Sequence, residues 1–377
     1  MKTLYYCEDM VNFIAERIFR TGPRTSLEVD ICPLNSDKQH KNKVFGRSGR
    51  DCLNTIRLLA ALQVVYGHSL THLHIESIPV LNECINFFYG VPIFFTMSGF
   101  LIWQSVGRSR GFREYLGKRF WRIFPELWAA VAIELIVLLC LYHDSISWPQ
   151  FVAFAITQGT IFQFWTPDCL RGYGCGTPNG ALWTICVLIQ FYFFVYFLYK
   201  VLHGRKTYIW MLWIITSLCV SVLLPIITRS FPEIACKLLN QTIIPYFWMF
   251  IFASFVAEKK DVVLPFLMKY CWAFFVGVIV VRYLNFDVHA SYNVLGTTML
   301  FFFLIGMAYT FPKINVTTDI SYGIYIYHMT IVNAFIVFGY TGNQLLLLPV
   351  ALITCVLAWL STKTIGNLCK KKKKKIV

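Results

Sequence analysis

Two ionisable residues lie in the first long apolar stretch of the chain, and their spacing places them on one face of a helix. Arg57 and His68 are eleven residues apart in "NTIRLLAALQVVYGHS", so they differ by only about 20° around a helix axis and by about 16 Å along it. Ionisable side chains in a membrane span normally face the bundle or a water-filled cavity, where a histidine can take a proton near neutral pH. The pair therefore points to acid–base chemistry. The alternative is an arginine that reaches to the lipid headgroups and a histidine that hydrogen-bonds a neighbouring helix.

The composition is typical of a membrane protein. Of the 377 residues, 57% are hydrophobic and only 14% are charged, which is unusual for a soluble globular domain. The net charge of +15 would suggest nucleic acid in a soluble protein, but the basic residues gather in short stretches between apolar segments, as the positive-inside rule describes. We therefore expect membrane lipid as a partner and no nucleic acid.

The apolar segments predict an all-α, polytopic membrane helix bundle with about ten transmembrane helices. A further segment, Trp148 to Trp165, contains several polar residues. If it crossed the bilayer, the basic stretches 203–206 and 258–261 would lie opposite 106–122, whereas a re-entrant or interfacial segment keeps all of them on one side. We therefore expect residues 167–179 outside and both termini in the cytoplasm. A helix needs about 20 residues to cross a bilayer. The predicted spans are 53–71, 84–105, 123–142, 180–202, 208–228, 242–257, 264–283, 293–311, 320–340 and 344–366.

Two further groups of residues suggest specific chemistry. Cys169 and Cys175 lie in the polar loop "TPDCLRGYGCGTPNG" and could form a disulfide if this loop faces an oxidising compartment. His68, His72 and His74 are close in sequence, but no acidic residue or cysteine accompanies them at a ligand spacing. We therefore expect no metal site.

Four stretches of the chain, in the same order, resemble the signature of the acyltransferase-3 family, whose members are membrane proteins that acylate extracytoplasmic sugars with an acyl-coenzyme A donor. The resemblance extends from about residue 50 to residue 366. The stretches are the Arg-x10-His of Arg57 and His68, "GVPIFFTMSGFLI" (90–102, the second span), "KRFWRIFP" (118–125, a basic loop) and "ISYGIYIYHMTIV" (320–332, a late span).

The resemblance implies an integral-membrane O-acyltransferase of the cell (inner) membrane, most simply an O-acetyltransferase. Acetyl-CoA or another acyl-CoA would be the donor substrate, with no permanently bound cofactor. The acceptor would be a hydroxyl of a cell-surface or exported glycan, free or lipid-linked. The predicted organisation is a cytoplasmic segment (1–50), which could hold a short amphipathic helix at 10–19, a transmembrane acyltransferase domain (51–368) and a polybasic cytoplasmic tail (369–377).

Acyl transfer to a hydroxyl needs a base and a group that stabilises the oxyanion. In this interpretation His68 is the base, although a covalent acyl-histidine is an alternative. Arg57 orients the thioester or binds donor phosphate. Arg119 and Arg122, three residues apart, would face similarly on a helix and hold the same phosphates, or else they only mark the cytoplasmic side.

One stretch departs from the family pattern. "LWTICVLIQFYF" resembles the usual Trp-Ser-Leu-x-Val-Glu-x-Gln-Phe-Tyr, but Leu188 stands where a glutamate is usual. Trp183 and Gln190 of this stretch are cavity candidates, as are Tyr325 and His328, with packing as the alternative for His328. The departure leaves two other functions open: a glycan or lipid transporter or flippase, and a non-catalytic envelope-assembly scaffold. A transporter would be expected to show repeated halves, and none is evident.

Overall fold

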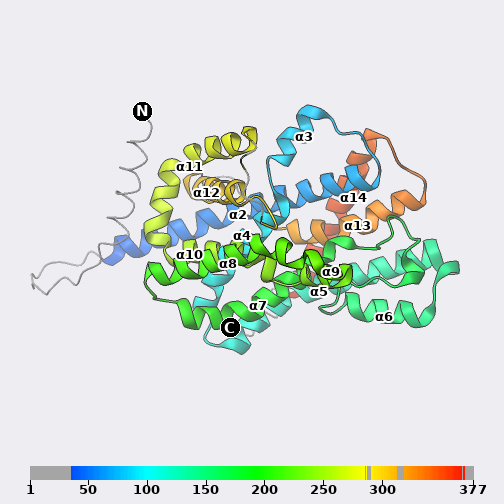
Figure 1. Ribbon diagram of the computed structural model, residues 1–377, viewed down its shortest axis with the longest axis horizontal. Helices are drawn as coiled ribbons and strands as arrows, with labels where there is room; N and C mark the ends of the chain where they lie inside the picture. Colours follow the sequence, from blue (N-terminus) through cyan, green and yellow to red (C-terminus); the bar gives the residue numbers. More distant parts are fainter. Residues whose placement is uncertain (1–34, 285, 287–289, 312–317, 367, 370–377) are drawn as a thin grey trace, which may run out of the picture.

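The fold is all-α, as predicted. The computed structural model describes residues 35–284, 286, 290–311, 318–366 and 368–369, with side chains from residue 52 onward, and these residues contain no strand. Most of the long helices run along the long axis of the molecule (Figure 1). The α-helices are α2 (Asn35–His72), α3 (Pro79–Asn86), α4 (Gly90–Gly107), α5 (Phe112–Tyr142), α6 (Trp148–Gln158), α7 (Trp183–Leu202), α8 (Thr207–Ile227), α9 (Glu233–Leu239), α10 (Phe247–Glu258), α11 (Lys260–Tyr283), α12 (Val294–Thr310), α13 (Ser321–Val337) and α14 (Leu347–Ser361).

Each of the ten predicted spans coincides with a helix, but the number of spans is not confirmed. Among the described residues, six helical segments are long and apolar enough to cross a bilayer, or seven if α9 and α10, bent by 53°, form one span. The 17 residues of α12 or α13 extend about 25 Å against a hydrocarbon core of about 30 Å. These lengths support a multi-pass membrane protein without fixing a count of ten.

The segment after α5 folds back along α5. α6 has 11 residues and extends about 16 Å, too little to cross the hydrocarbon core. The Trp128 indole of α5 donates a 2.8 Å hydrogen bond to the carbonyl of Gly159, just after α6. Phe151 and Phe154 of α6 pack on Leu138 of α5. This agrees with the prediction that the segment does not cross.

Two sequence-based boundaries differ from the structure. α2 begins at Asn35, because no helix-breaking proline lies between Pro33 and Pro79, so the predicted boundary at residue 51 falls within a continuous helix. The stretch 118–125, expected as a basic loop, lies inside α5, where Lys118 pairs with Glu114 one turn earlier. The predicted amphipathic helix at 10–19 and most of the lysine tail lie outside the described residues.

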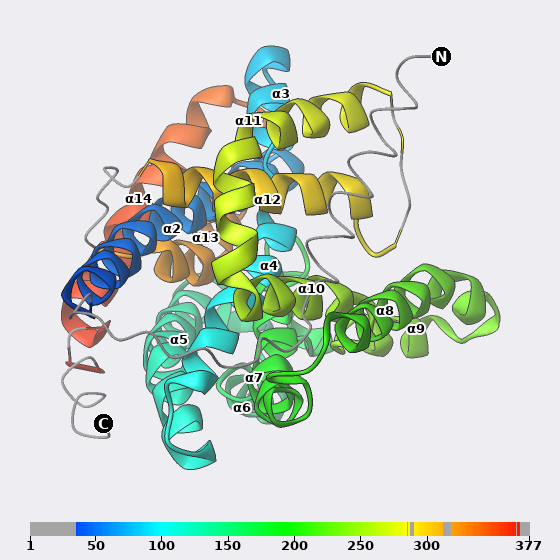
Figure 2. The same cartoon turned by 90° about the vertical axis from the view of Figure 1, so that its left-hand side faces the viewer.

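The centre of the bundle is α2, which packs on α4, α12, α13 and α14. Figure 2 shows α8 and α9 at one side, away from α2, α13 and α14. α4 also packs closely on α10: a Cβ added at Gly99 would lie 2.5 Å from the carbonyl oxygen of Phe250. Small residues allow membrane helices to approach in this way, so Gly99 has a packing role.

Hydrogen bonds between distant segments hold each end of the bundle. At one end, the amide of Gly342 donates to the carbonyl of Leu73 at 2.8 Å. At the other end, the Glu258 carboxylate accepts from the Trp103 indole at 2.8 Å and from the amide of Gly204 at 2.9 Å. The basic stretches that follow α4, α7 and α10 therefore meet at the same end, which also carries Arg119.

Candidate active site

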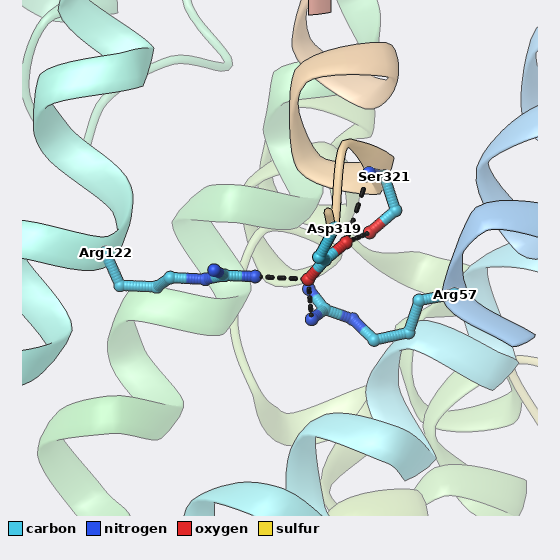
Figure 3. A network of polar contacts seen from close by, with 4 residues as sticks. All are labelled: Arg57, Arg122, Asp319 and Ser321. Atoms are coloured by element: carbon cyan, nitrogen blue, oxygen red, sulfur yellow. Dashed lines mark hydrogen bonds and ion pairs between the residues drawn. The ribbon is translucent and has the colours of Figure 1, made fainter. Parts of the chain in front are cut away.

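Two arginines from different helices share one carboxylate (Figure 3). Arg57 of α2 and Arg122 of α5 both bind Oδ2 of Asp319, at 2.7 Å and 2.5 Å. The other oxygen, Oδ1, accepts from the amide of Ser321 at 3.2 Å and from its hydroxyl at 2.5 Å. Asp319 thus joins α2, α5 and the start of α13.

The electrostatic environment keeps Asp319 ionised. Burial alone would raise the pKa of this carboxyl group, but Arg57 and Arg122 and the bonds from Ser321 outweigh it, so the pKa lies well below its ordinary value. Asp319 faces both guanidinium groups, and the carboxylate of Glu126, four residues after Arg122, also interacts electrostatically with Arg122. Together with Arg119, the site holds three positive charges against these two negative ones.

Arg119 adds a third guanidinium group. Its side chain hydrogen-bonds Ser105 of α4 and lies 5.7 Å from the ring centroid of Tyr115 and 5.5 Å from that of Tyr192. Its Nε is buried and has no hydrogen-bond partner among the described residues. Tyr192 links this arginine to the other two, because its ring also lines a cavity with Arg57 and Arg122.

The cavity has a volume of about 70 Å³. It is polar at the arginines and elsewhere mostly apolar, and Leu188, the residue that departs from the family pattern, lies in its wall. A leucine supplies no charge to this wall, and the carboxylate bonded to Arg57 and Arg122 is that of Asp319. The other lining residues are Val91, Phe94, Phe95, Ser98, Ile123, Thr184, Ile185, Tyr322 and Tyr325.

His68 lies farther along α2, beside a second histidine. Its Nδ1 is 2.9 Å from Nε2 of His328 on α13. Nδ1 of His328 in turn is 2.8 Å from the carbonyl oxygen of Tyr325. His328 is fully buried, whereas His68 is partly exposed.

Tyr325 stands between the cavity and the histidines. Its ring lines the cavity and lies 5.8 Å from the His328 ring, and its hydroxyl is bonded to Thr184 at 2.7 Å and to the carbonyl of Ala181 at 3.0 Å. His68 does not itself line the cavity. The structure therefore connects Arg57, Tyr325, His328 and His68 as neighbours in one site.

Two residues predicted near the cavity lie elsewhere. Trp183 packs between Phe95 and Tyr246 and is not part of the cavity wall. Gln190 donates to the carbonyl of Gln241 at 2.7 Å and accepts from the amide of Ile243 at 3.2 Å. The helical period explains this arrangement, because Gln190 is about 200° from Leu188 around α7, so it holds the bend between α9 and α10 instead.

The structure does not contain the predicted disulfide: Cys169 and Cys175 are both free thiols. The two ends of their loop are held by different elements. The amide of Cys169 binds Gln150 of α6 at 3.2 Å, whereas the amide of Cys175 binds Asn333 of α13 at 2.8 Å. Asn333, which sequence reasoning missed, also donates to the carbonyls of Thr177 and Pro178.

Asp319 was also missed by sequence reasoning, although a signal exists. It is the last acidic residue of the chain and directly precedes "ISYGIYIYH". An isolated acid at the edge of an apolar span needs a partner. Arg57 and Arg122, each near the boundary of an apolar segment, are its natural candidates.

Comparisons with known proteins agree on one family. A family model described as "Acyltransferase domain" matches residues 50–363. Nodulation protein 10 of Rhizobium leguminosarum bv. viciae is 26% identical over 343 residues, covering 83% of this chain and 91% of that protein. An O-acetyl transferase of Shigella phage Sf6 is 31% identical over 147 residues, covering 36% of this chain and 41% of that protein. No solved structure matches the chain.

Proposed function

Because the chain belongs to the acyltransferase-3 family, we propose that it is an integral-membrane O-acyltransferase that moves an acyl group, most simply acetyl, from cytoplasmic acyl-CoA to a glycan hydroxyl. The observation that carries the proposal is the arrangement on α2. Arg57 lines a positively charged cavity at one end of the bundle, and His68 lies beside His328 farther along the same helix. The O-acetyl transferase of the phage supports acetyl as the acyl group.

The arginine cluster is the proposed donor site. Guanidinium groups bind phosphate oxygens in pairs, and acyl-CoA carries several phosphates. Asp319 fixes the positions of Arg57 and Arg122, and with Glu126 it still leaves one of the three arginine charges uncompensated. Arg119 stays in place through Ser105 and the tyrosine rings, so the cluster is preorganised for an anion. The apolar part of the cavity, which runs past Leu188 to Tyr325 beside His328, would take the arm that carries the acyl group toward His68.

His68 is the proposed general base. It takes the proton of the acceptor hydroxyl as that oxygen attacks the thioester carbonyl carbon. The tetrahedral intermediate then collapses, the carbon–sulfur bond breaks, and the proton held by His68 passes to the departing thiolate. The products are the acylated glycan and free coenzyme A. His68 is partly exposed, which a base that meets an acceptor from outside the bundle requires.

The proposed orientation places the arginines on the cytoplasmic side. The basic stretches after α4, α7 and α10 meet at the end that carries them, in keeping with the positive-inside rule. Both termini would then be cytoplasmic, in the cell membrane, and the glycan, free or lipid-linked, would approach the opposite end. Where the family pattern has a glutamate, which would place a charge in the cavity wall, this chain has Leu188. The acceptor class is therefore proposed for this chain and is not taken over from the family pattern.

The test uses membrane vesicles that contain the protein, labelled acetyl-CoA and surface glycan from the same cells. We expect label in the glycan, and His68→Ala should reduce the transfer at least about 100-fold because a general base typically contributes that much. The matched control is Leu59→Ala on an exposed face of α2, which should retain near-normal transfer. Normal transfer by a well-expressed His68→Ala variant would overturn the mechanism, and label that never enters glycan would overturn the function.

A further inference from the structure

The two histidines of the site form a hydrogen-bonded chain that ends on a backbone carbonyl. His68 Nδ1 is 2.9 Å from His328 Nε2, and His328 Nδ1 is 2.8 Å from the carbonyl oxygen of Tyr325. A carbonyl oxygen can only accept a hydrogen bond. Nδ1 of His328 therefore carries a proton.

The position of that proton determines the protonation of the remaining ring nitrogens of both histidines. His328 is fully buried, and among the described residues no aspartate or glutamate bonds either ring. An unpaired buried cation is costly, so His328 is neutral and its Nε2 presents a lone pair. The bond of 2.9 Å then requires that Nδ1 of His68 donates. His68 likewise has no acidic partner among the described residues, so it is neutral as well and its Nε2 carries no proton.

We infer that His328 is a positioning residue that holds His68 in the tautomer with a free Nε2. The catalytic consequence of this inference rests on the proposed function, since Nε2 would be the atom that takes the acceptor's proton. A neighbouring hydrogen bond commonly selects the tautomer of a working histidine. Here a neutral histidine serves in place of the usual carboxylate.

The neutral partner has a chemical consequence. When Nε2 of His68 takes the hydroxyl proton, the Nδ1–H of the new imidazolium still donates to His328, and the carbonyl of Tyr325 polarises that acceptor in turn. No negative charge neutralises the cation. It therefore returns the proton to the departing thiolate more readily than an imidazolium bound to a carboxylate would.

Other titratable groups around the pair are few. His72, one turn beyond His68 on α2, has its ring centroid 5.6 Å from that of His68. Tyr325 on α13 lies 5.8 Å from His328, and its hydroxyl is bonded to Thr184 and Ala181. Neither supplies a second acceptor to Nδ1 of His68.

The direct test is independent of enzyme activity. Nitrogen-15 NMR of histidine-labelled protein in vesicles distinguishes protonated from unprotonated ring nitrogens, and the signals of His68 and His328 are assigned by their loss in His68→Gln and His328→Gln. We expect a protonated Nδ1 and an unprotonated Nε2 on both rings at pH 7. In His328→Leu, the proton of His68 should no longer be held on Nδ1. A wild-type His68 with its proton on Nε2, or an unchanged His68 tautomer in His328→Leu, would overturn the inference.

A second test compares an acceptor with a non-acceptor at position 328. Gln can place an amide oxygen near the site of Nε2, whereas Leu cannot accept at all. We expect His328→Leu to lower kcat about 100-fold with little change in the donor KM, and His328→Gln to stay within about tenfold of the wild type. Val332→Ala, at another fully buried position of α13, controls for loss of packing.

Each outcome of the second test has a separate meaning. A folded His328→Leu protein with unchanged kcat, or a His328→Gln protein as slow as His328→Leu, would contradict a positioning role. If the wild type transfers no acyl group at all, the proposed function fails, while the NMR result still decides the state of His68.

Discussion

Asp319 is the residue on which the arrangement of the arginines depends. Its carboxylate binds Arg57 and Arg122 through one oxygen and Ser321 through the other. Removing one partner of a largely buried ion pair leaves charges without compensation. The two guanidinium groups would then repel each other across the cavity.

We predict that Asp319→Asn lowers stability by about 2 kcal/mol, because breaking a buried pair is costly and the partly exposed arginines are screened. The measurement is the thermal unfolding midpoint in detergent. The pH dependence of stability follows from the lowered pKa of Asp319. The contribution of Asp319 to the free energy of unfolding is present above the pKa that this group has in the unfolded chain, and it is lost as the pH falls through the pKa that it has in the folded protein. Glu233→Gln, which breaks the exposed pair with Lys237, should change the midpoint little. Equal midpoints for Asp319→Asn and the wild type would contradict this account.

At the residue scale, sequence reasoning found Arg57, His68, Arg122, Tyr325 and His328, which the structure brings together. It singled out Arg57 and His68 because ionisable groups in an apolar span are conspicuous, and the other three through the resemblance to the family. It missed Asp319 because the sequence around this residue does not show which other helices lie beside it. Gln190 was misplaced for another reason, since the helical period alone separates it from Leu188.

At the scale of the elements, the contact between α4 and α10 depends on a residue without a side chain. A Cβ at Gly99 would lie 2.5 Å from the Phe250 carbonyl oxygen and 3.0 Å from its Cα. These are backbone atoms, which cannot move aside as a flexible side chain can. The two helices would have to separate.

We therefore predict that Gly99→Ala destabilises the protein by about 1–3 kcal/mol, the usual cost of overpacking. The measurement is the thermal midpoint together with the yield of folded protein. Gly67→Ala is the matched control, because it also lies inside a helix but its Cβ would meet nothing within 4 Å. A Gly99→Ala protein as stable as Gly67→Ala would show that α4 and α10 are not in tight contact.

The positions of the helices were largely predictable from sequence, whereas their neighbours were not. Apolar segments mark α7, α8 and α14 clearly, because each lacks charge over about 20 residues. Such helices are apolar on all sides, so their sequence does not say which side faces lipid and which faces protein. The apolar pattern also does not show how far α2 and α5 extend beyond their apolar segments.

At the scale of the whole molecule, the gathering of the basic stretches at one end of the bundle predicts which end faces the cytoplasm. Arg171 and Arg205 are both exposed, so a reagent can reach a cysteine at either position. We predict that cysteines introduced at 171 and 205 react with an impermeant thiol reagent from opposite sides of the membrane, with 205 on the cytoplasmic side. The parent protein gives the background from its own cysteines. Labelling of both positions from one side would exclude this topology.

The continuous helix α2 also sets a length requirement on the donor. Arg57 and His68 are fixed about 16 Å apart along one rigid rod, so a donor whose phosphates rest at Arg57 needs an arm of roughly that reach to present its carbonyl near His68. The pantetheine chain of coenzyme A is such an arm. Acetyl phosphate, whose reactive carbon is directly joined to its phosphate, cannot occupy both places at once. We therefore expect acetyl phosphate to support no transfer, even at concentrations at which it competes with acetyl-CoA for the arginines. Transfer from it would show that Arg57 and His68 do not act on one donor molecule.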